Sequence, residues 1–191
     1  MQHNVATAGG TISGMENANL KGTTKSCSDP GVSECAECFA ASARAHVRRA
    51  ELASLPGTGL GSFIVRAGRT KELTANGTGD VVFDATQLRV RSHGVLRINI
   101  GPTTTHVIIR VHGTMRLGRA AEIRVDDPGK VLFLVDGMFF ARRSSHVRGT
   151  IFGADLVQVG IQTITDGQLL SDKQVKALRS AAVQLKSFQG W

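Results

Sequence analysis

Residues 147–175 read VRGTIFGADLVQVGIQTITDGQLLSDKQV, and the first half of this stretch is echoed by the second. Four positions carry the echo: Gly149, Ile151, Phe152 and Val157 are matched by Gly167, Leu169, Leu170 and Val175. In each copy a glycine, which favours a turn, precedes apolar residues in alternation, which favour a strand. A repeat of this kind predicts β-strand rungs stacked on one another.

The same restart occurs three more times upstream, at Gly94, Gly113 and Gly137. The five glycines, at positions 94, 113, 137, 149 and 167, are unevenly spaced, so the chain is not a tandem repeat of fixed length. Because the spacings centre on about 18 residues, we expect a coil of rungs joined by turns of variable length.

Short β-strands are predicted throughout the region from residue 62 onward, where the apolar period is two. The candidate strands are 62–66, 80–83, 87–91, 95–100, 106–111, 114–117, 122–125, 131–135, 138–141, 146–152 and 156–159. Turn signals such as Asn76-Gly77 and Asp136-Gly137 separate them. Because no helical pattern lies between these strands, the sequence excludes a doubly wound α/β fold.

One long helix is predicted over residues 34–55, ahead of the rungs. Ser33 can cap its N-terminus, and Pro56-Gly57 ends it. Apolar residues recur along one stripe, which gives the helix one face to bury. We therefore expect a mainly β protein, a right-handed β-helix (solenoid) with one long α-helix packed alongside.

The whole chain, residues 1–191, is predicted to form a single β-solenoid domain. Residues 1–33 would supply an N-terminal rung and a loop that carries the cysteines, with short strands in 4–24 and the polar loop in 25–33. The helix would follow at 34–55 and the rungs at 62–188. Residues 171–188 are ambiguous, because a capping box at Ser171 and Gln174 predicts a helix whereas the echo between Gly149 and Gly167 predicts strands. We favour the strands slightly.

The charge balance is basic, with 23 Lys and Arg against 15 Asp and Glu, a net charge of +8. Such a charge favours anionic partners, which include nucleic acid, acidic glycans and anionic lipid surfaces. Aromatic residues make up only 5% of the chain, so few side chains could stack on the bases of a nucleic acid. Nucleic acid is therefore a less expected partner than an acidic glycan. The sequence contains neither a membrane-spanning apolar run nor a visible signal peptide.

Six arginines lie within predicted strands, beside apolar neighbours. They are Arg89, Arg91, Arg97, Arg110, Arg116 and Arg124. Strand alternation points such residues outward, and stacked rungs would align them in a ladder spaced by about 4.8 Å. A further set extends the basic region: Arg119, Arg142, Arg143 and Arg148. A row of guanidinium groups suits the phosphate, sulfate or carboxylate groups of a polymer, while a solvated face that resists edge-to-edge aggregation would also explain it.

Three cysteines, Cys27, Cys35 and Cys38, lie close together in the sequence. A disulfide from Cys27 to Cys35 or to Cys38, free thiols, and a zinc site completed by His46 are all compatible with this cluster. Because the spacing matches no zinc pattern, we expect no metal and no cofactor.

No catalytic constellation stands out in the sequence. The only dense set of acids is Asp126, Asp127 and Asp136, and Asp127 belongs to an Asp-Pro-Gly turn. His93 and His112 both precede a restart glycine, so they would stack on adjacent rungs, although a repeated turn residue is the simpler explanation. We therefore do not expect an enzyme.

The segments Val131-Leu-Phe-Leu-Val-Asp-Gly-Met-Phe-Phe and Gly149-Thr-Ile-Phe-Gly153 resemble two groups of bacterial and archaeal surface proteins. One is the choice-of-anchor A domain, and the other is the ice-binding-like adhesin β-solenoid, in which a long helix lies against the rungs. The resemblance covers roughly residues 34–170 and implies an exported, surface-associated β-helix without catalysis. Ice binding would need a flat face of regularly spaced threonines, and Thr163 and Thr165 are nearly the only such pair, so we do not expect it.

Taken together, these patterns predict a non-catalytic structural or adhesive domain of a secreted or cell-surface protein. Its arginine-rich face is expected to contact acidic polysaccharide or another acidic polymer of the cell surface. Two alternatives remain open. One is a polysaccharide-acting enzyme on a β-helix scaffold, which needs converging acids, and the other is a protein that binds nucleic acid or other polyanions.

Overall fold

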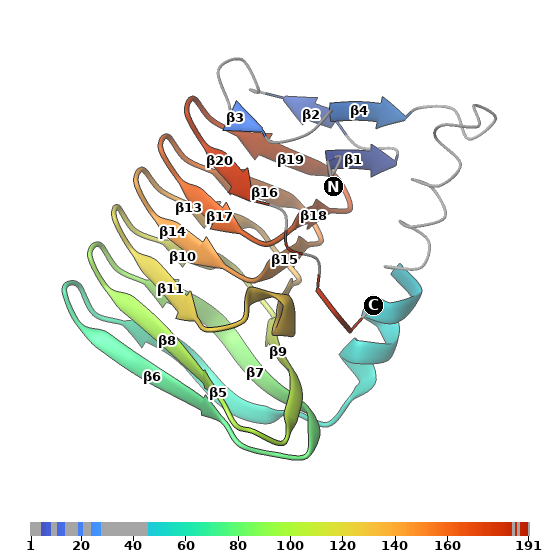
Figure 1. The fold of residues 1–191 in the computed structure, drawn as a ribbon, viewed down its shortest axis with the longest axis vertical. Helices are drawn as coiled ribbons and strands as arrows, with labels where there is room; N and C mark the ends of the chain where they lie inside the picture. Colours follow the sequence, from blue (N-terminus) through green and yellow to red (C-terminus); the bar gives the residue numbers. More distant parts are fainter. Residues whose placement is uncertain are drawn as a thin grey trace.

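The computed structural model describes residues 5–8, 11–13, 19–20, 24–27, 46–184, 186 and 188–190, with backbone alone for the first four ranges. The protein is mainly β, and its strands pair in parallel (Figure 1). From β8 onward each strand lies beside the strand three places later in the chain. Three successive strands therefore form a unit that repeats along the stack, which we call a rung. This arrangement is consistent with the coil of rungs that the sequence predicts.

Each rung places one strand on each of three faces. Face A is formed by the first half of β7 (Gly79–Val90), β9 (Thr104–Val111), β12 (Val131–Val135), β15 (Thr150–Gly153) and β18 (Leu169–Ser171). Face B is formed by β5 (Thr58–Val65), the second half of β7, β10 (Met115–Leu117), β13 (Phe139–Ala141), β16 (Leu156–Val159), β19 (Gln174–Ala177) and β2 (Thr11–Ser13). Face C is formed by β6 (Thr70–Ala75), β8 (Val95–Ile100), β11 (Glu122–Val125), β14 (His146–Arg148), β17 (Ile164–Asp166), β20 (Ala182–Gln184) and β3 (Asn19–Leu20).

The long strand β7 connects faces A and B into one 11-stranded sheet, because its first half pairs with β9 and its second half with β10. Two candidate strands of the sequence, 80–83 and 87–91, are therefore parts of one strand. Strand β6 was not among the candidates. Face C is a separate 7-stranded sheet.

The rungs shorten along the stack. On face B, Leu88 lies beside Met115, and Met115 lies beside Phe139. The next two steps, from Phe139 to Val157 and from Val157 to Val175, are shorter, and they match the step from Gly149 to Gly167. The echo in the sequence is thus confirmed for the upper rungs. The rung from Leu88 to Met115 is longer because its strand on face A is longer, with eight residues in β9 against four in β15, and the rung from Met115 to Phe139 is longer mainly because of the turn at residues 126–130.

The five restart glycines lie at three different corners of the rung, which explains their unequal spacing. Gly113 and Gly137 lie side by side at the corner between faces A and B, where the Gly137 N–H donates to the Gly113 carbonyl. Gly149 and Gly167 lie between faces C and A, and Gly94 lies between faces B and C. At Gly167 φ is +156°, and a Cβ there would collide with the carbonyl oxygen of Gly149, so only glycine fits.

The N-terminal strands continue the stack beyond its last C-terminal rung. β2 pairs with β19 and β3 pairs with β20 (Figure 1). β1 (Val5–Ala8) pairs with β4 (Thr24–Cys27). The short strands predicted for residues 4–24 are confirmed where the structure describes them. β4 extends to residue 27, into the segment predicted as a polar loop.

Residues 171–188 contain strands, as the echo predicts, and not the helix that the capping box suggests. β19 and β20 lie in this segment, joined by a tight turn. Ser171 does use its side chain as a cap would, because its Oγ accepts hydrogen bonds from the N–H groups of Lys173 and Gln174. These bonds close the tight turn between β18 and β19, so the same local chemistry serves a turn instead of a helix.

A helical segment, residues 46–54, lies against the outer side of face A (Figure 1). Its Leu52 is fully buried and packs with Ile108, Leu132 and Phe188 in a second apolar cluster, separate from the core inside the rungs. The predicted helix is confirmed over these residues, and its first part, 34–45, lies outside the described residues. Because face A is covered on both sides, all five residues of β12 are buried.

Stacked apolar side chains fill the interior of the rungs. Phe133 lies between Ile109 and Ile151 on neighbouring strands, and all three are fully buried. Each such side chain contributes about 1.5–3 kcal/mol by its removal from water. The stack therefore owes its stability to the repetition of one inward-facing pattern from rung to rung.

The corner between faces B and C repeats one tight turn in every rung. The third residue of this turn has a positive φ. In five of the rungs that residue is not glycine; these residues are His93, Ala120, Ser144, Gln162 and Ser180. In each turn the fourth N–H donates to the first carbonyl, as in a type II β-turn. In addition, the backbone N–H groups at four of these positions donate to a carbonyl oxygen of the next rung. They belong to His93, Ala120, Ser144 and Gln162, and the N–H of Ala120, for example, donates to the Arg143 carbonyl. These bonds hold the residues in the left-handed region.

The corner yields a test by paired substitutions. Ala120→Gly removes the cost of a left-handed alanine, which exceeds the extra chain entropy of glycine, so we expect the free energy of unfolding to rise by about 0.5–1 kcal/mol. Ala121→Gly, one residue further in the same turn and fully buried, should lower it by about 1 kcal/mol. Urea unfolding followed by circular dichroism measures both. A loss of stability in Ala120→Gly would contradict the corner geometry.

Candidate anion-binding surface

The six arginines predicted to form one ladder lie on three faces and one corner. Arg89 and Arg116 lie side by side on face B, and Arg97 and Arg124 lie side by side on face C. Arg110 lies on face A, and Arg91 lies at the corner between faces B and C. The single ladder was wrong, because a three-sided rung turns successive outward positions toward different sides of the molecule.

Arg110 points outward from β9 as alternation requires, but the helical segment covers it. Its side chain is 10% exposed. Nε and Nη2 donate to the two carboxylate oxygens of Asp84 at 2.7 and 2.6 Å, and Nη1 donates to the carbonyl oxygens of Leu52 and Ala53 at the end of the helix. The Arg110 hydrogen bond is the main reason why the pKa of Asp84 lies below its usual value. Arg110 therefore anchors the helix to face A and is unavailable to a polymer.

His112 extends this anchor at the corner between faces A and B. Its Nδ1 lies 3.0 Å from Asp136 and its Nε2 3.1 Å from Asp84. The hydrogen bond to Asp136, opposed by burial and supported by Asp84, raises the pKa of His112. His93 lies at a different corner, so the two histidines do not stack on adjacent rungs, and each lies in a turn, which is the explanation that the sequence favours.

The three acids that a carbohydrate-acting enzyme would have needed do not converge. Asp126 and Asp127 lie in the turn before β12, where Asp127 accepts from the Gly129 N–H ahead of a 3₁₀ turn (Pro128–Lys130) and pairs with Lys186. Lys186 is the main reason why the pKa of Asp127 is lowered. Asp136 follows the other end of β12, five residues of strand away. Their places are explained by turns and ion pairs.

Thr163 and Thr165 face the interior of the rungs. Both are fully buried, and the Thr163 Oγ1 donates to the carbonyl oxygen of Arg142 in the corner below. This pair therefore forms no part of an outward threonine face.

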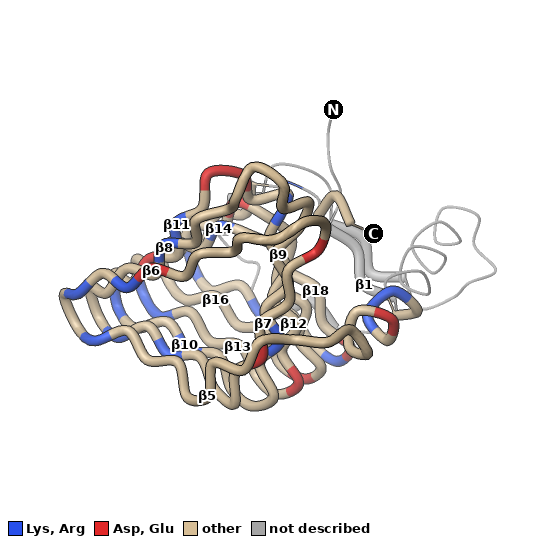
Figure 2. The backbone as a smooth tube through the Cα atoms, turned by 90° about the horizontal axis from the view of Figure 1, so that it is seen from below, with Lys and Arg blue, Asp and Glu red and all other residues tan. Residues whose placement is uncertain are grey.

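Exposed arginines gather along the corner between faces B and C, which we call the arginine edge. Its members are Arg66, Arg69, Arg91, Arg119, Arg142, Arg143 and Arg179. The six turns of this corner contain no Asp or Glu, and none of these arginines forms an ion pair with a residue that the structure describes. Figure 2 shows the basic positions along the left edge of the stack.

The arginine edge was only partly anticipated. Arg91, Arg119, Arg142 and Arg143 were candidates, whereas Arg66, Arg69 and Arg179 were not. The signal that would have found Arg179 is its position directly before Ser180, which matches Arg119 before Ala120 and Arg143 before Ser144. Arg148, the remaining candidate, lies on face C with its Nε 3.4 Å from Asp166.

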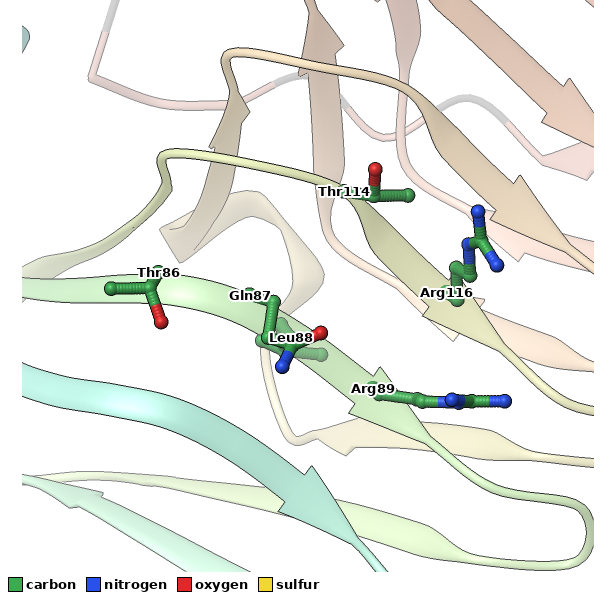
Figure 3. Close-up of a pocket in the computed structure, with 6 residues that line it drawn as sticks. All are labelled: Thr86, Gln87, Leu88, Arg89, Thr114 and Arg116. Atoms are coloured by element: carbon green, nitrogen blue, oxygen red, sulfur yellow. The ribbon is translucent and has the colours of Figure 1, made fainter.

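A shallow open depression of about 490 Å³ lies on face B, next to the arginine edge (Figure 3). Its walls come from two adjacent rungs: Thr86, Gln87, Leu88 and Arg89 from the lower one, and Thr114 and Arg116 from the upper one. Arg89 and Arg116 project from register-paired positions on neighbouring strands, and the Arg116 side chain turns toward the next rung. The Arg116 guanidinium also lies 5.7 Å from the centre of the Phe140 ring, which helps to position it.

Two pairs of arginines lie side by side on neighbouring strands, and only one pair has its charge neutralised by carboxylates. On face C, Arg97 lies 3.9 Å from Glu72, and Arg124 donates to Glu122 at 2.6 Å. On face B, neither Arg89 nor Arg116 has a carboxylate partner among the described residues. Of these two arginine pairs, the one on face B is therefore the pair without a neutralising carboxylate.

The remaining candidates are mostly outside the described residues. Cys35 and Cys38 lie there, and only the backbone of Cys27 is described, so the disulfide stays a prediction. His46 lies 3.5 Å from Asp172. Within the described part of the chain, no group of three or more His, Cys, Asp or Glu residues has the geometry to hold a metal ion. The helical residues that the structure describes form no segment long and apolar enough to span a membrane.

No protein-family model matches the chain, and none of the curated proteins compared with it matches. The resemblance to the choice-of-anchor A and ice-binding-like domains therefore stays a prediction.

Removing Arg110 should cost far more stability than removing an exposed arginine. Arg110→Ala removes the two-pronged bond to Asp84, which then keeps only the contact to His112, and it leaves two helix carbonyls without the guanidinium. We therefore expect a loss of about 3–5 kcal/mol in the free energy of unfolding. Arg124→Ala breaks only an exposed pair and should cost about 0–1 kcal/mol. Chemical unfolding of both variants tests this. Equal losses would show that Arg110 does not anchor the helix.

His112 should stabilise the fold more at low pH than at high pH. Its folded pKa is raised above the ordinary value of 6.5, so its stabilising effect is present below that value and is lost as the pH rises through the folded pKa. The cost of His112→Gln should therefore be larger at about pH 5.5 than at about pH 9. His93→Gln, which removes an imidazole with no carboxylate contact in the described residues, serves as the control. A cost of His112→Gln that does not change with pH would contradict the assignment.

Proposed function

We propose that this chain is a right-handed β-helix that acts as a non-catalytic structural or adhesive domain of a secreted or cell-surface protein. It binds a linear acidic polymer, an acidic polysaccharide above all, along the arginine edge. One observation carries the proposal: seven exposed arginines line one corner of the stack without a carboxylate beside them. The proposed location at the cell surface rests on the resemblance of residues 131–140 and 149–153 to surface proteins.

The distribution of charge favours a polymer over a small ligand. Acidic residues lie mainly near the helix and the corner between faces A and B, where Arg49 pairs with Asp136 and Asp172. The opposite corner has no such compensation and extends over several rungs. A rigid positive edge of this kind attracts a polyanion by many weak contacts, each of which is screened by salt.

The two alternative functions have less support. The acids needed by a polysaccharide-acting enzyme lie at opposite ends of β12, with Asp126 and Asp127 before it and Asp136 after it. Nucleic acid shares the negative charge of an acidic polysaccharide, but the arginine edge interleaves no aromatic side chain with its arginines, and stacking platforms are what single-strand binding uses.

Paired substitutions of equal charge test the arginine edge. In Arg119→Gln with Arg142→Gln, two members of the edge are lost. We expect weaker retention on immobilised heparin or polygalacturonate at low salt. The slope of log affinity against log salt concentration should become smaller in magnitude by about two, because two charged contacts are lost. Arg97→Gln with Arg124→Gln removes the same charge from residues already neutralised by glutamates, and should change neither quantity.

Two results would reject the proposal. If both double variants weaken retention equally, binding follows net charge and not the edge. If the unaltered protein passes through both columns at low salt, the edge binds no acidic polymer. The cellular location is tested separately, by whether the complete gene encodes an export signal or a surface anchor.

A further inference from the structure

The depression on face B contains a pair of like charges that the protein itself does not neutralise. Arg89 and Arg116 occupy directly opposite positions on β7 and β10. Like charges at such positions destabilise a sheet unless something compensates them. On face C the equivalent pair is compensated by Glu72 and Glu122. The missing counter-charge on face B is therefore a feature of this site and not of stacked arginines in general.

The rest of the lining is polar but uncharged. The hydroxyl groups of Thr86 and Thr114 make no hydrogen bond to any residue that the structure describes, so both remain free to donate and accept. Gln87 donates through Nε2 to the Ser62 hydroxyl at 2.8 Å, which fixes its amide and leaves Oε1 as an acceptor. The depression thus combines two guanidiniums with three groups that suit the hydroxyls of a sugar.

The depression also adjoins the arginine edge. Arg89 lies two residues before Arg91, and the chain passes directly from β7 into the corner. A polymer held along the edge would therefore reach the depression with a neighbouring unit. This proximity distinguishes the site from an isolated surface hollow.

We propose that the depression is a subsite for one acidic sugar unit, with Arg89 and Arg116 on its carboxylate or sulfate group and Thr86, Gln87 and Thr114 on its hydroxyls. This inference rests on the proposed function and narrows its ligand to acidic carbohydrate. A guanidinium group binds two oxygens of a carboxylate or of a sulfate in the same two-pronged way. The site is therefore expected to accept either acidic group. The one ring nearby, Phe140, is already engaged by Arg116.

Short oligosaccharides separate this subsite from the charge of the whole edge. The probes are trigalacturonate, which carries only carboxylates, a sulfated maltotriose, neutral maltotriose and a thymidine trinucleotide. Titration calorimetry on the intact chain at low salt should show one bound molecule per chain for at least one acidic sugar. Neither the neutral sugar nor the trinucleotide should bind comparably. The two acidic probes distinguish a carboxylate from a sulfate ligand.

Variants assign the binding to named residues. Arg89→Gln and Arg116→Gln should each weaken binding of the acidic trisaccharide by about tenfold or more, the usual effect of a lost charge-assisted hydrogen bond. Thr86→Val with Thr114→Val keeps the charge and should weaken binding about threefold to tenfold. Arg97→Gln with Arg124→Gln should leave it within about twofold. Backbone amide shifts in the unaltered protein provide a readout that needs no variant, and they should move at residues 86–89 and 114–116.

Several outcomes would overturn the subsite. Equal weakening by the face B and face C variants would show that only net charge matters. A trinucleotide that binds as tightly as the acidic sugars would show a general oxyanion site without carbohydrate selectivity. If no trisaccharide binds, the subsite is absent, yet the edge can still hold long polymers. Conversely, Arg119→Gln with Arg142→Gln should lose polymer retention while it keeps trisaccharide binding, so the two proposals can fail separately.

Discussion

The backbone hydrogen bonds between successive rungs are the constraint on which the rest of the structure depends. Every strand on faces A, B and C is parallel to its neighbours, so each rung must repeat the path of the one below at a spacing of about 4.8 Å. A buried N–H or C=O without a partner is costly, and therefore no rung can change its corners freely. Length varies only where strands or turns can lengthen without loss of register, as in β9 and in the turn at residues 126–130.

This constraint explains residues that look unfavourable on their own. Ala120 and Gln162 adopt a left-handed conformation because their N–H groups complete the bonds between rungs. The local strain is about 1–2 kcal/mol at each such residue. It is tolerated because the corner also buries a small residue beside each of them, such as Ala121 and Thr163. The arginines of this corner occupy the first, second or fourth position of the same repeated turn, and they therefore gather along one edge.

The fold could be predicted from the sequence further than the site could. Alternation and the echo from Gly149 to Gly167 identify strands, rungs and even the C-terminal strands. The corners could not be assigned, because Ala and Gln give no signal for a positive φ and because the rungs that begin at Leu88, Met115 and Phe139 differ in length, which obscures the period. Alternation correctly pointed Arg110 outward but could not show that a helix covers that side. The unbroken apolar run of β12 was the available clue, since such runs are buried on both faces.

The position of the helix also determines where the positive charge remains. On the helix side, Arg49 pairs with Asp136 and Asp172, and Arg110 pairs with Asp84. These three carboxylates are therefore not available to neutralise arginines on the other sides of the molecule. The far corner keeps its arginines uncompensated, and the cluster is densest from Arg66 to Arg143, four rungs that span about 14 Å at the spacing of stacked strands. The next rung, with Gly160, Ile161 and Gln162 at this corner, has no arginine there. The strongest contact with an acidic polymer is therefore expected over the four lower rungs, beside the depression that Arg89 and Arg116 border.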